Sequence, residues 1–181
     1  MNIKATRIII IIVGLAFLTA IAFGIIGKLS VDNQEITDYL ESMTPVAQAH
    51  IQWLEDYKKL TESYAVLSNS EKVEELNKLL DRMEDIQIDI EESNPPNILS
   101  GVKAKWNSEC VKIVQAVYQM SLGLERNIPE WISEAYELLL DADQLRKEWV
   151  DELSGLLNKY NIGDSGFPLS SYYEEVNNLS D

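Results

Sequence analysis

Apolar and polar residues follow a helical spacing along most of the chain. After an unbroken apolar run at residues 8–27, apolar side chains recur every three or four residues as far as Tyr160. This spacing puts apolar residues on one face of a helix and polar residues on the other. No stretch alternates with the two-residue period of a strand. The pattern therefore predicts an all-α fold.

The first amphipathic stripe follows the apolar run. We expect a helix break at Gly27–Ser30, with Asp32 and Glu35 as a capping box for a new helix. Pro45 lies inside the stripe, so a kink is expected there, or a fresh start with Thr44 as the cap. Two adjacent columns make up the apolar face: Ile36, Leu40, Met43, Ala47, His50, Leu54, Tyr57 and Tyr64, and Tyr39, Val46, Trp53, Leu60 and Leu67.

Three further stripes predict three more long helices. The second begins at Ser70 and stops at Asn94-Pro95-Pro96, and the fourth opens at Asn127 with Glu130 at the capping-box position. The apolar positions are Val73, Leu76, Leu79, Leu80, Met83, Ile86 and Ile90 in the second helix, Leu99, Val102, Trp106, Cys110, Ile113, Val117, Met120 and Leu124 in the third, and Trp131, Ala135, Leu138, Ala142, Leu145, Trp149, Leu153, Leu156 and Tyr160 in the fourth.

Short connections between these helices predict an antiparallel up-down-up-down four-helix bundle after a single N-terminal transmembrane helix. The second helix is too short to cover residues 32–44, which must pack on the fourth helix, on the C-terminal tail or on another molecule. In the tail, Ser171 and Glu174 form a possible capping box for a short last helix. The predicted organisation is a cytoplasmic N-terminus (1–7), a transmembrane helix (8–27), a membrane-proximal helical stalk (28–44), the four-helix bundle (45–160) and a C-terminal tail (161–181).

Residues 8–27 have the length and composition of a membrane span. They carry no charged side chain, and at about 1.5 Å per residue they cover about 30 Å, the thickness of a bilayer's hydrocarbon core. Lys4 and Arg7 precede the span and acidic residues follow it, which predicts a cytoplasmic N-terminus and an extracytoplasmic C-terminal domain. The alternative is secretion after cleavage near Ala22. Because the apolar run continues beyond Ala22, a retained anchor in membrane lipid is favoured.

The charge distribution restricts the classes of partner. The chain has 15 basic and 30 acidic residues, and residues 29–181 alone carry a net charge of −18. Such a surface repels nucleic acid and anionic lipid and attracts cationic partners, so nucleic-acid binding is not expected. Cys110 is the sole cysteine, so no intramolecular disulfide can form.

Two groups of residues suggest contacts with other proteins. Small residues every four positions in the apolar run would let a second helix approach closely. The third helix carries a second apolar row, which either the tail covers, through Phe167, Leu169, Tyr172 and Tyr173, or a protein partner or a second copy covers. The candidate interaction surface therefore comprises Val111, Val114, Tyr118, Leu122, Ala16, Ala20 and Gly24.

Residues typical of catalysis are missing from the sequence. A di-iron site needs paired Glu-x-x-His motifs, whereas His50 is the sole histidine and Ala47 stands three residues before it. One cysteine cannot form the Cys-x-x-Cys-His motif of covalent haem. Haem ligated by His50 and a methionine, or a Cys110–His50 nucleophilic pair, is formally possible, but no oxyanion-hole loop accompanies the pair. We therefore expect no enzyme activity and no catalytic, metal or cofactor-binding residues.

The tryptophans suggest a second function. They lie on or beside the apolar stripes, so they either pack the core or line an interhelical pocket for an apolar ligand. The candidate pocket comprises His50, Trp53, Trp106, Trp131 and Trp149. The layout resembles the extracytoplasmic four-helix sensor domains of bacterial receptors in fold, but it lacks their second membrane span and cytoplasmic output module. The leading hypothesis is a membrane-anchored, non-enzymatic accessory or protein-interaction subunit, and the alternative is a sensor-like ligand-binding domain.

Overall fold

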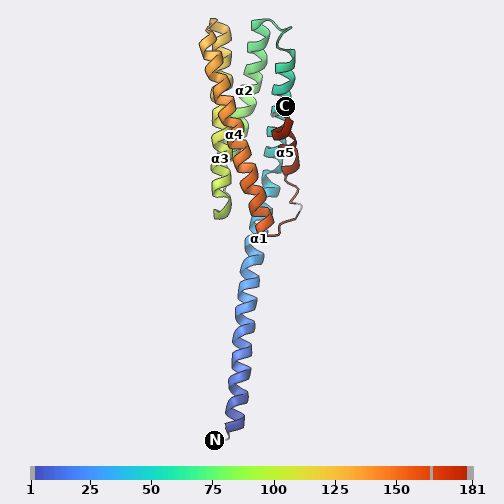
Figure 1. The fold of residues 1–181 in the computed structure, drawn as a ribbon, viewed down its shortest axis with the longest axis vertical. Coiled ribbons are helices and arrows are strands. Elements are labelled where there is room, and N and C mark those ends of the chain that lie inside the picture. The colour runs from blue at the N-terminus through green and yellow to red at the C-terminus, as the bar shows by residue number, and fades with distance from the viewer. Residues whose placement is uncertain (1–2, 164, 179–181) are drawn as a thin grey trace.

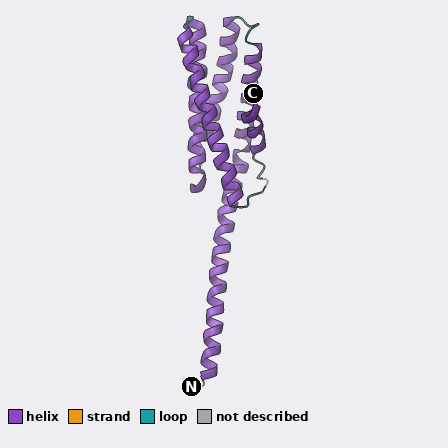
Figure 2. Cartoon of the chain, viewed as in Figure 1, coloured by secondary structure: helices purple, strands orange, loops and turns teal. Residues whose placement is uncertain are grey.

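The structure, a computed structural model, describes the backbone of residues 3–163 and 165–178 and the side chains of residues 33–163 and 165–174. This part of the chain is mostly helical, without strands, and four of its helices are long (Figure 2). The all-helical prediction with four long helices is thus confirmed. The elements are α1 (Ile3–Ser63), α2 (Asn69–Glu92), a 3₁₀ turn (Asn97–Leu99), α3 (Ser100–Arg126), α4 (Pro129–Lys159) and α5 (Leu169–Asn178) (Figure 1).

The four long helices run alternately up and down and form a bundle (Figure 1). α3 packs against α2 and α4, and α2 packs against α1. The short helix α5 contacts both α4 and α1, so it lies on the side where the ring of four helices would otherwise close. The N-terminal part of α1 projects from one end of the bundle.

Helix α1 is continuous from Ile3 to Ser63, so the break predicted at residues 27–30 is absent. A single glycine costs about 1 kcal/mol in a helix, which good helix-forming neighbours can offset. At about 1.5 Å per residue, its 61 residues make a helix roughly 90 Å long.

Pro45 also lies inside α1, and no new helix starts at Thr44. The Thr44 hydroxyl does not act as a cap but donates a hydrogen bond to the backbone carbonyl of Leu40 at 3.0 Å. On either side of the proline, Met43 and Ala47 are buried. Their burial offsets the backbone hydrogen bond that proline cannot donate.

The part of α1 nearest the projecting segment belongs to the core of the bundle. Ile36, Leu40 and Met43 are each at most 4% exposed. The amide of Asn33 donates to the backbone carbonyl of Tyr160, just after the end of α4, at 3.0 Å.

Of the alternatives for residues 32–44, the described residues show two: packing near the end of the fourth helix and packing against the tail, where Asn33 and Thr37 line a cleft with Ile162. The second helix also reaches this stretch, contrary to expectation, because the Tyr39 hydroxyl lies 3.0 Å from the Ser93 hydroxyl just after α2.

The turn between α3 and α4 is tighter than the sequence suggested. Asn127 has a φ of 55° and ends α3 in the left-handed conformation, so α4 begins at Pro129 and not at Asn127. A Cβ atom on Gly123 would lie 2.9 Å from the Ile132 side chain and 3.2 Å from the Ile128 carbonyl oxygen. Glycine thus allows the close approach of the two helices here.

Helix α5 begins at Leu169, directly after Pro168, and not at the predicted Ser171 cap. Tyr172 is fully buried, and its hydroxyl donates a hydrogen bond to the backbone carbonyl of Ala47 in α1 at 3.1 Å. The expectation that the tail covers the second apolar row of α3 is wrong, because α5 packs against α1 and α4.

The predicted membrane segment, residues 8–27, lies in the part of α1 where only the backbone is described. The side chains of Ala16, Ala20 and Gly24 are therefore outside the described residues. Within the described portion of the chain, no helix is found that is both long enough and apolar enough to cross a membrane.

Replacing Tyr172 by phenylalanine tests how α5 is held. The change removes the hydroxyl that donates to the Ala47 carbonyl and lies 3.2 Å from His50 Nδ1, so we expect the free energy of unfolding to fall by about 1 kcal/mol. Faster amide hydrogen exchange in α5 should accompany this loss. Tyr173→Phe is the matched control, because the Tyr173 hydroxyl donates only to the exposed Asp151 carboxylate, and its effect should stay within about 0.5 kcal/mol. Equal effects of the two substitutions would contradict this view of α5.

Candidate functional site

A cluster of buried polar side chains lies at the centre of the bundle. We call it the buried polar cluster; it joins four helices and comprises His50 from α1, Trp106 and Glu109 from α3, Arg146 and Trp149 from α4, and Tyr172 from α5. Each of these side chains is at most 3% exposed. Buried polar groups are costly unless each has a partner, so their pairing decides what the cluster can do.

His50 occupies the core stripe of α1, as the sequence indicated. The indole nitrogen of Trp106 donates a hydrogen bond to His50 Nδ1 at 3.0 Å. Because an indole nitrogen can only donate, Nδ1 must be unprotonated, which places the proton of the neutral imidazole on Nε2. That nitrogen faces Glu109 Oε1 at 3.5 Å.

Glu109 and Arg146 form a buried ion pair between α3 and α4. Arg146 Nε donates to Glu109 Oε1 at 2.6 Å, and its Nη1 donates to Asp143 at 2.8 Å. The other carboxylate oxygen of Glu109 accepts a hydrogen bond from the Trp149 indole at 2.6 Å. Removing one partner of such a pair typically costs about 3–5 kcal/mol, because the other charge stays buried without compensation.

Burial controls the ionisation of these groups. Desolvation lowers the pKa of His50 well below its ordinary value, and the nearby charge of Arg146 lowers it further. Desolvation raises the pKa of Glu109, while Arg146 and Trp149 oppose that rise. All groups facing Glu109 are donors, which suits its ionised form. Burial also raises the pKa of the Cys110 thiol well above its ordinary value, which keeps it protonated.

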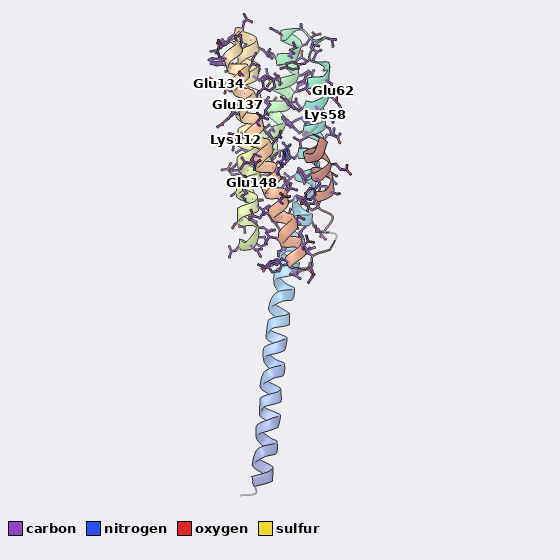
Figure 3. The ribbon with its side chains drawn as sticks, viewed as in Figure 1. Lys58, Glu62, Lys112, Glu134, Glu137 and Glu148 are labelled. Atoms are coloured by element: carbon purple, nitrogen blue, oxygen red, sulfur yellow. The ribbon has the colours of Figure 1, made fainter. Side chains whose placement is uncertain are left out.

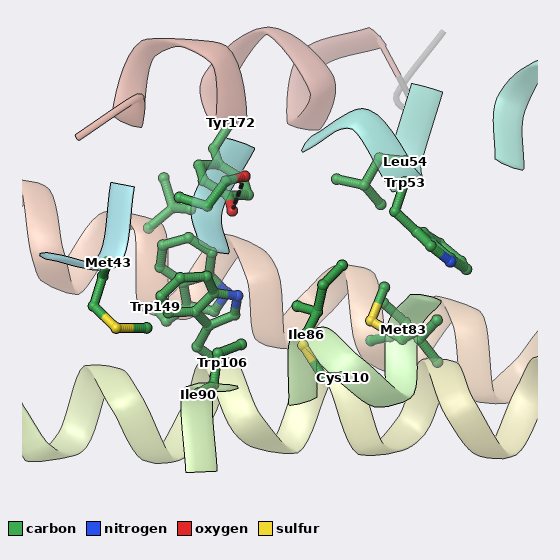
Figure 4. Packing of buried hydrophobic residues seen from close by; sticks show 14 of the residues in the cluster. Met43, Trp53, Leu54, Met83, Ile86, Ile90, Trp106, Cys110, Trp149 and Tyr172 are labelled. Carbon is green, nitrogen blue, oxygen red and sulfur yellow. Dashed lines mark hydrogen bonds between the residues drawn. The ribbon is translucent and has the colours of Figure 1, made fainter. Parts of the chain in front are cut away.

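Aromatic rings connect α5 to the cluster. The Tyr172 ring meets Trp149 edge-to-face at 4.8 Å between centroids, and Phe167 meets Trp106 in the same way at 6.0 Å. Trp106 and Trp149 stack on each other at 5.3 Å (Figure 4). The remaining space beside these two tryptophans is about 10 Å³, which leaves no room for a ligand.

The predicted pocket residues do not surround one cavity. His50, Trp106 and Trp149 come together in the buried polar cluster, whereas Trp53 lies apart from them (Figure 4). The Trp53 indole donates to the Leu79 carbonyl at 2.7 Å. Trp131 is near the α3–α4 turn, where the Arg126 guanidinium lies 5.6 Å from its ring.

Trp53 lines a separate cavity between α1 and α4, which we call the α1–α4 cavity. Its volume is about 120 Å³. Its walls are mostly apolar, and Arg146 and Asp143 also line it. The Tyr57 ring stacks on Trp53 at 5.3 Å and forms part of the same wall.

The second apolar row of α3 lies on the outer surface. Tyr118 is 55% exposed, while Val111, Val114 and Leu122 are partly exposed. Two residues of this row, Tyr118 and Leu122, form a shallow groove of about 360 Å³ together with α4, which we call the α3–α4 groove. It is lined by Gln115, Tyr118, Gln119, Leu122, Trp131 and Leu138.

Sequence reasoning missed Glu109 and Arg146, although the spacing contained a signal. Glu109 stands three residues after Trp106, and Arg146 stands three residues before Trp149. Each therefore lies on the apolar face of its helix. Opposite charges on the core faces of two neighbouring helices indicate a buried pair.

The geometry of the buried polar cluster is that of a closed structural unit. His50 Nε2 lies 3.5 Å from Glu109 without a hydrogen bond, and both side chains are fully buried. Among the described side chains, no set of three or more histidine, cysteine, aspartate or glutamate residues is arranged to hold a metal ion. The hydrogen bonds of the cluster connect α1, α3, α4 and α5.

The pH dependence of stability tests the state of His50. Below about pH 6.5 the unfolded chain binds a proton at this histidine that the folded chain does not bind. The contribution of neutral His50 to the free energy of unfolding is therefore fully present above that pH and is lost as the pH decreases below it. Relative to His50→Asn, the free energy of unfolding should fall by about 1.4 kcal/mol per pH unit below about pH 6.

Urea unfolding of the full chain in zwitterionic detergent, followed by tryptophan fluorescence between about pH 5.5 and 8, measures this difference. His50 is the sole histidine, and Glu109 and Asp143 titrate in both proteins, so the difference isolates the imidazole. The same pH slope in both proteins would show that His50 is not held neutral.

In comparisons with known proteins, the chain matches no protein-family model, no curated protein and no solved structure. Similarity therefore assigns neither a family nor an activity. The geometry of the described side chains is the basis for assigning a function.

Proposed function

We propose that the chain is a membrane-anchored, non-enzymatic interaction subunit whose acidic helical bundle lies outside the cytoplasm. The observation that carries this proposal is the continuity of α1, which joins residues 8–27 to the bundle core without a flexible linker. A bundle attached in this way has a fixed orientation relative to the membrane. That property suits a subunit which presents a surface to a partner.

The chemistry of the buried groups supports a non-enzymatic role. The Cys110 thiol is buried, and burial raises its pKa, which disfavours the nucleophilic thiolate. The Nδ1 atom of His50 is occupied by the Trp106 indole. Both groups act as parts of the core.

The candidate interaction surfaces differ in how much apolar surface each leaves exposed to a partner. Residues 33–44 contribute Ile36, Leu40 and Met43 to the core, so little apolar surface remains there. The second row of α3 is uncovered by α5 and stays available. Self-association through Ala16, Ala20 and Gly24 remains part of the proposal.

Cysteine labelling in intact cells tests the orientation. We expect Ser70→Cys, an exposed position in α2, to react with a membrane-impermeant maleimide from outside the cell. Asn2→Cys should react only after permeabilisation. The unchanged chain is the matched control, because its sole cysteine is buried and should not react while the protein is folded.

Two outcomes would contradict the proposal. Labelling of Asn2→Cys from outside the cell, without labelling of Ser70→Cys, would show that the orientation in the membrane is the reverse of the proposed one. Recovery of the protein in the soluble fraction, with a new N-terminus near Phe23, would establish secretion after cleavage.

A second candidate function, binding of a small apolar ligand, is favoured by the α1–α4 cavity. Its volume of about 120 Å³ compares with about 150 Å³ for an engineered apolar cavity that binds benzene. The stacked Trp53 and Tyr57 rings provide an aromatic wall. An apolar ligand would bind in this cavity. Of the residues of the predicted pocket, only Trp53 lines it.

Benzene and indole are suitable probes for the α1–α4 cavity. At concentrations about tenfold above Kd, each should raise the melting temperature of the full chain by about 3 °C or more. Ala142→Val, which narrows the cavity, should abolish this rise. Ala116→Val is the matched control, because Ala116 is equally buried but does not line the cavity. A rise that persists in Ala142→Val would place the binding elsewhere, and no rise in the unchanged chain would argue against this second function.

A further inference from the structure

The α3–α4 groove is an apolar surface on the outside of a strongly acidic bundle. Tyr118 projects into solvent, and Leu122, Trp131 and Leu138 line the groove beside it. Its lining residues come from α3 and α4, which lie side by side and run in opposite directions (Figure 1), so the groove lies along these two helices. A shape of this kind fits the apolar face of another helix.

Acidic residues follow the groove along α4. Glu130, Glu134, Glu137, Asp141 and Glu148 are spaced three, four or seven residues apart and are all exposed. Figure 3 labels three of them, Glu134, Glu137 and Glu148. Within the described part of the chain, Glu130, Glu134 and Glu137 form no ion pair with lysine or arginine, and Glu134 accepts a hydrogen bond from the Gln119 amide across the groove. Asp141 pairs with Lys112 at 2.8 Å, and Glu148 lies 3.9 Å from the Lys105 ammonium.

The charges decide between the possible occupants of the groove. A second copy would bring the same acidic row against this one, and each copy carries a net charge of −15. The chain's own α5 lies against α1 and α4 on another side of the bundle. A basic partner is attracted by the carboxylates that have no lysine or arginine beside them, whereas a second copy is repelled.

We infer that the α3–α4 groove docks an amphipathic helix of a partner protein, with an apolar face flanked by lysine or arginine. The apolar face packs on Tyr118, Leu122 and Trp131, and the basic side chains reach Glu134 and Glu137. This inference rests on the proposed role as an interaction subunit and names the class of partner. The apolar contacts supply affinity, and the charges supply orientation and rate of association.

A synthetic peptide of known sequence tests the groove directly. We would use a helical peptide of about 18 residues, with leucines at positions i, i+3, i+4 and i+7 and lysines beside them. Full-length protein in phosphatidylcholine nanodiscs is titrated with the labelled peptide, and empty nanodiscs give the background. Peptides with serine in place of leucine, or glutamate in place of lysine, should bind at least about tenfold more weakly.

Two pairs of variants separate the groove from general attraction to acidic surfaces. Tyr118→Ser should weaken binding about tenfold, whereas Ile88→Ser should not change it. Ile88 is the matched control because it is 48% exposed among acidic residues of α2, outside the groove. Glu134→Gln combined with Glu137→Gln should weaken binding and reduce its salt dependence, whereas Glu84→Gln combined with Asp85→Asn should not.

Fluorine NMR of protein labelled with fluorotryptophan locates the bound peptide. Of the four tryptophans, Trp131 lines the groove, while Trp53, Trp106 and Trp149 are buried. The Trp131 signal should therefore shift on binding and the other three should stay in place. No binding, binding equally weakened by Ile88→Ser, or an unchanged Trp131 signal would overturn the inference. The outcome does not depend on membrane orientation, so it is distinguishable from failure of the proposed function.

Discussion

The buried ion pair between Glu109 and Arg146 is the constraint on which the arrangement of the helices depends. Two charges removed from water are tolerated only while each keeps its partner. A rotation or shift of α3 against α4 would separate them, so other packings of these amphipathic helices are disfavoured. The apolar faces of α3 and α4 alone would permit several packings with similar burial. The pair therefore contributes to the choice of one structure more than to the total stability.

Two further helices, α1 and α5, are connected to the same pair. Trp149 donates to Glu109, and Trp106, one turn before Glu109, donates to His50 of α1. Tyr172 of α5 completes the set against Ala47 and Trp149. Because α5 lies between α1 and α4, these two helices make few direct contacts with each other. The α1–α4 cavity lies between the same two helices, α1 and α4, that α5 contacts.

The sequence predicted the helices better than their ends or the polar core. The spacing of apolar residues identified four long helices because the buried face of each helix is mostly apolar. The start of α4 was misplaced, since Asn127 ends α3 with a positive φ that no stripe of apolar residues reveals. Glu109 and Arg146 were overlooked because the stripes were read from apolar residues alone. The position of α5 was not predictable from spacing, because it depends on which pair of helices leaves a gap.

The continuity of α1 links the two proposals made for this chain. If residues 8–27 span a bilayer, α1 carries the bundle with its long axis close to the direction of that span, since no flexible linker separates them. The α3–α4 groove follows the same axis, because α3 and α4 run alongside α1 in the bundle. A helix docked in it would stand along the membrane normal and not lie on the lipid surface. The geometry thus favours a partner segment that itself leaves the membrane as a helix over one whose basic face rests on anionic lipid.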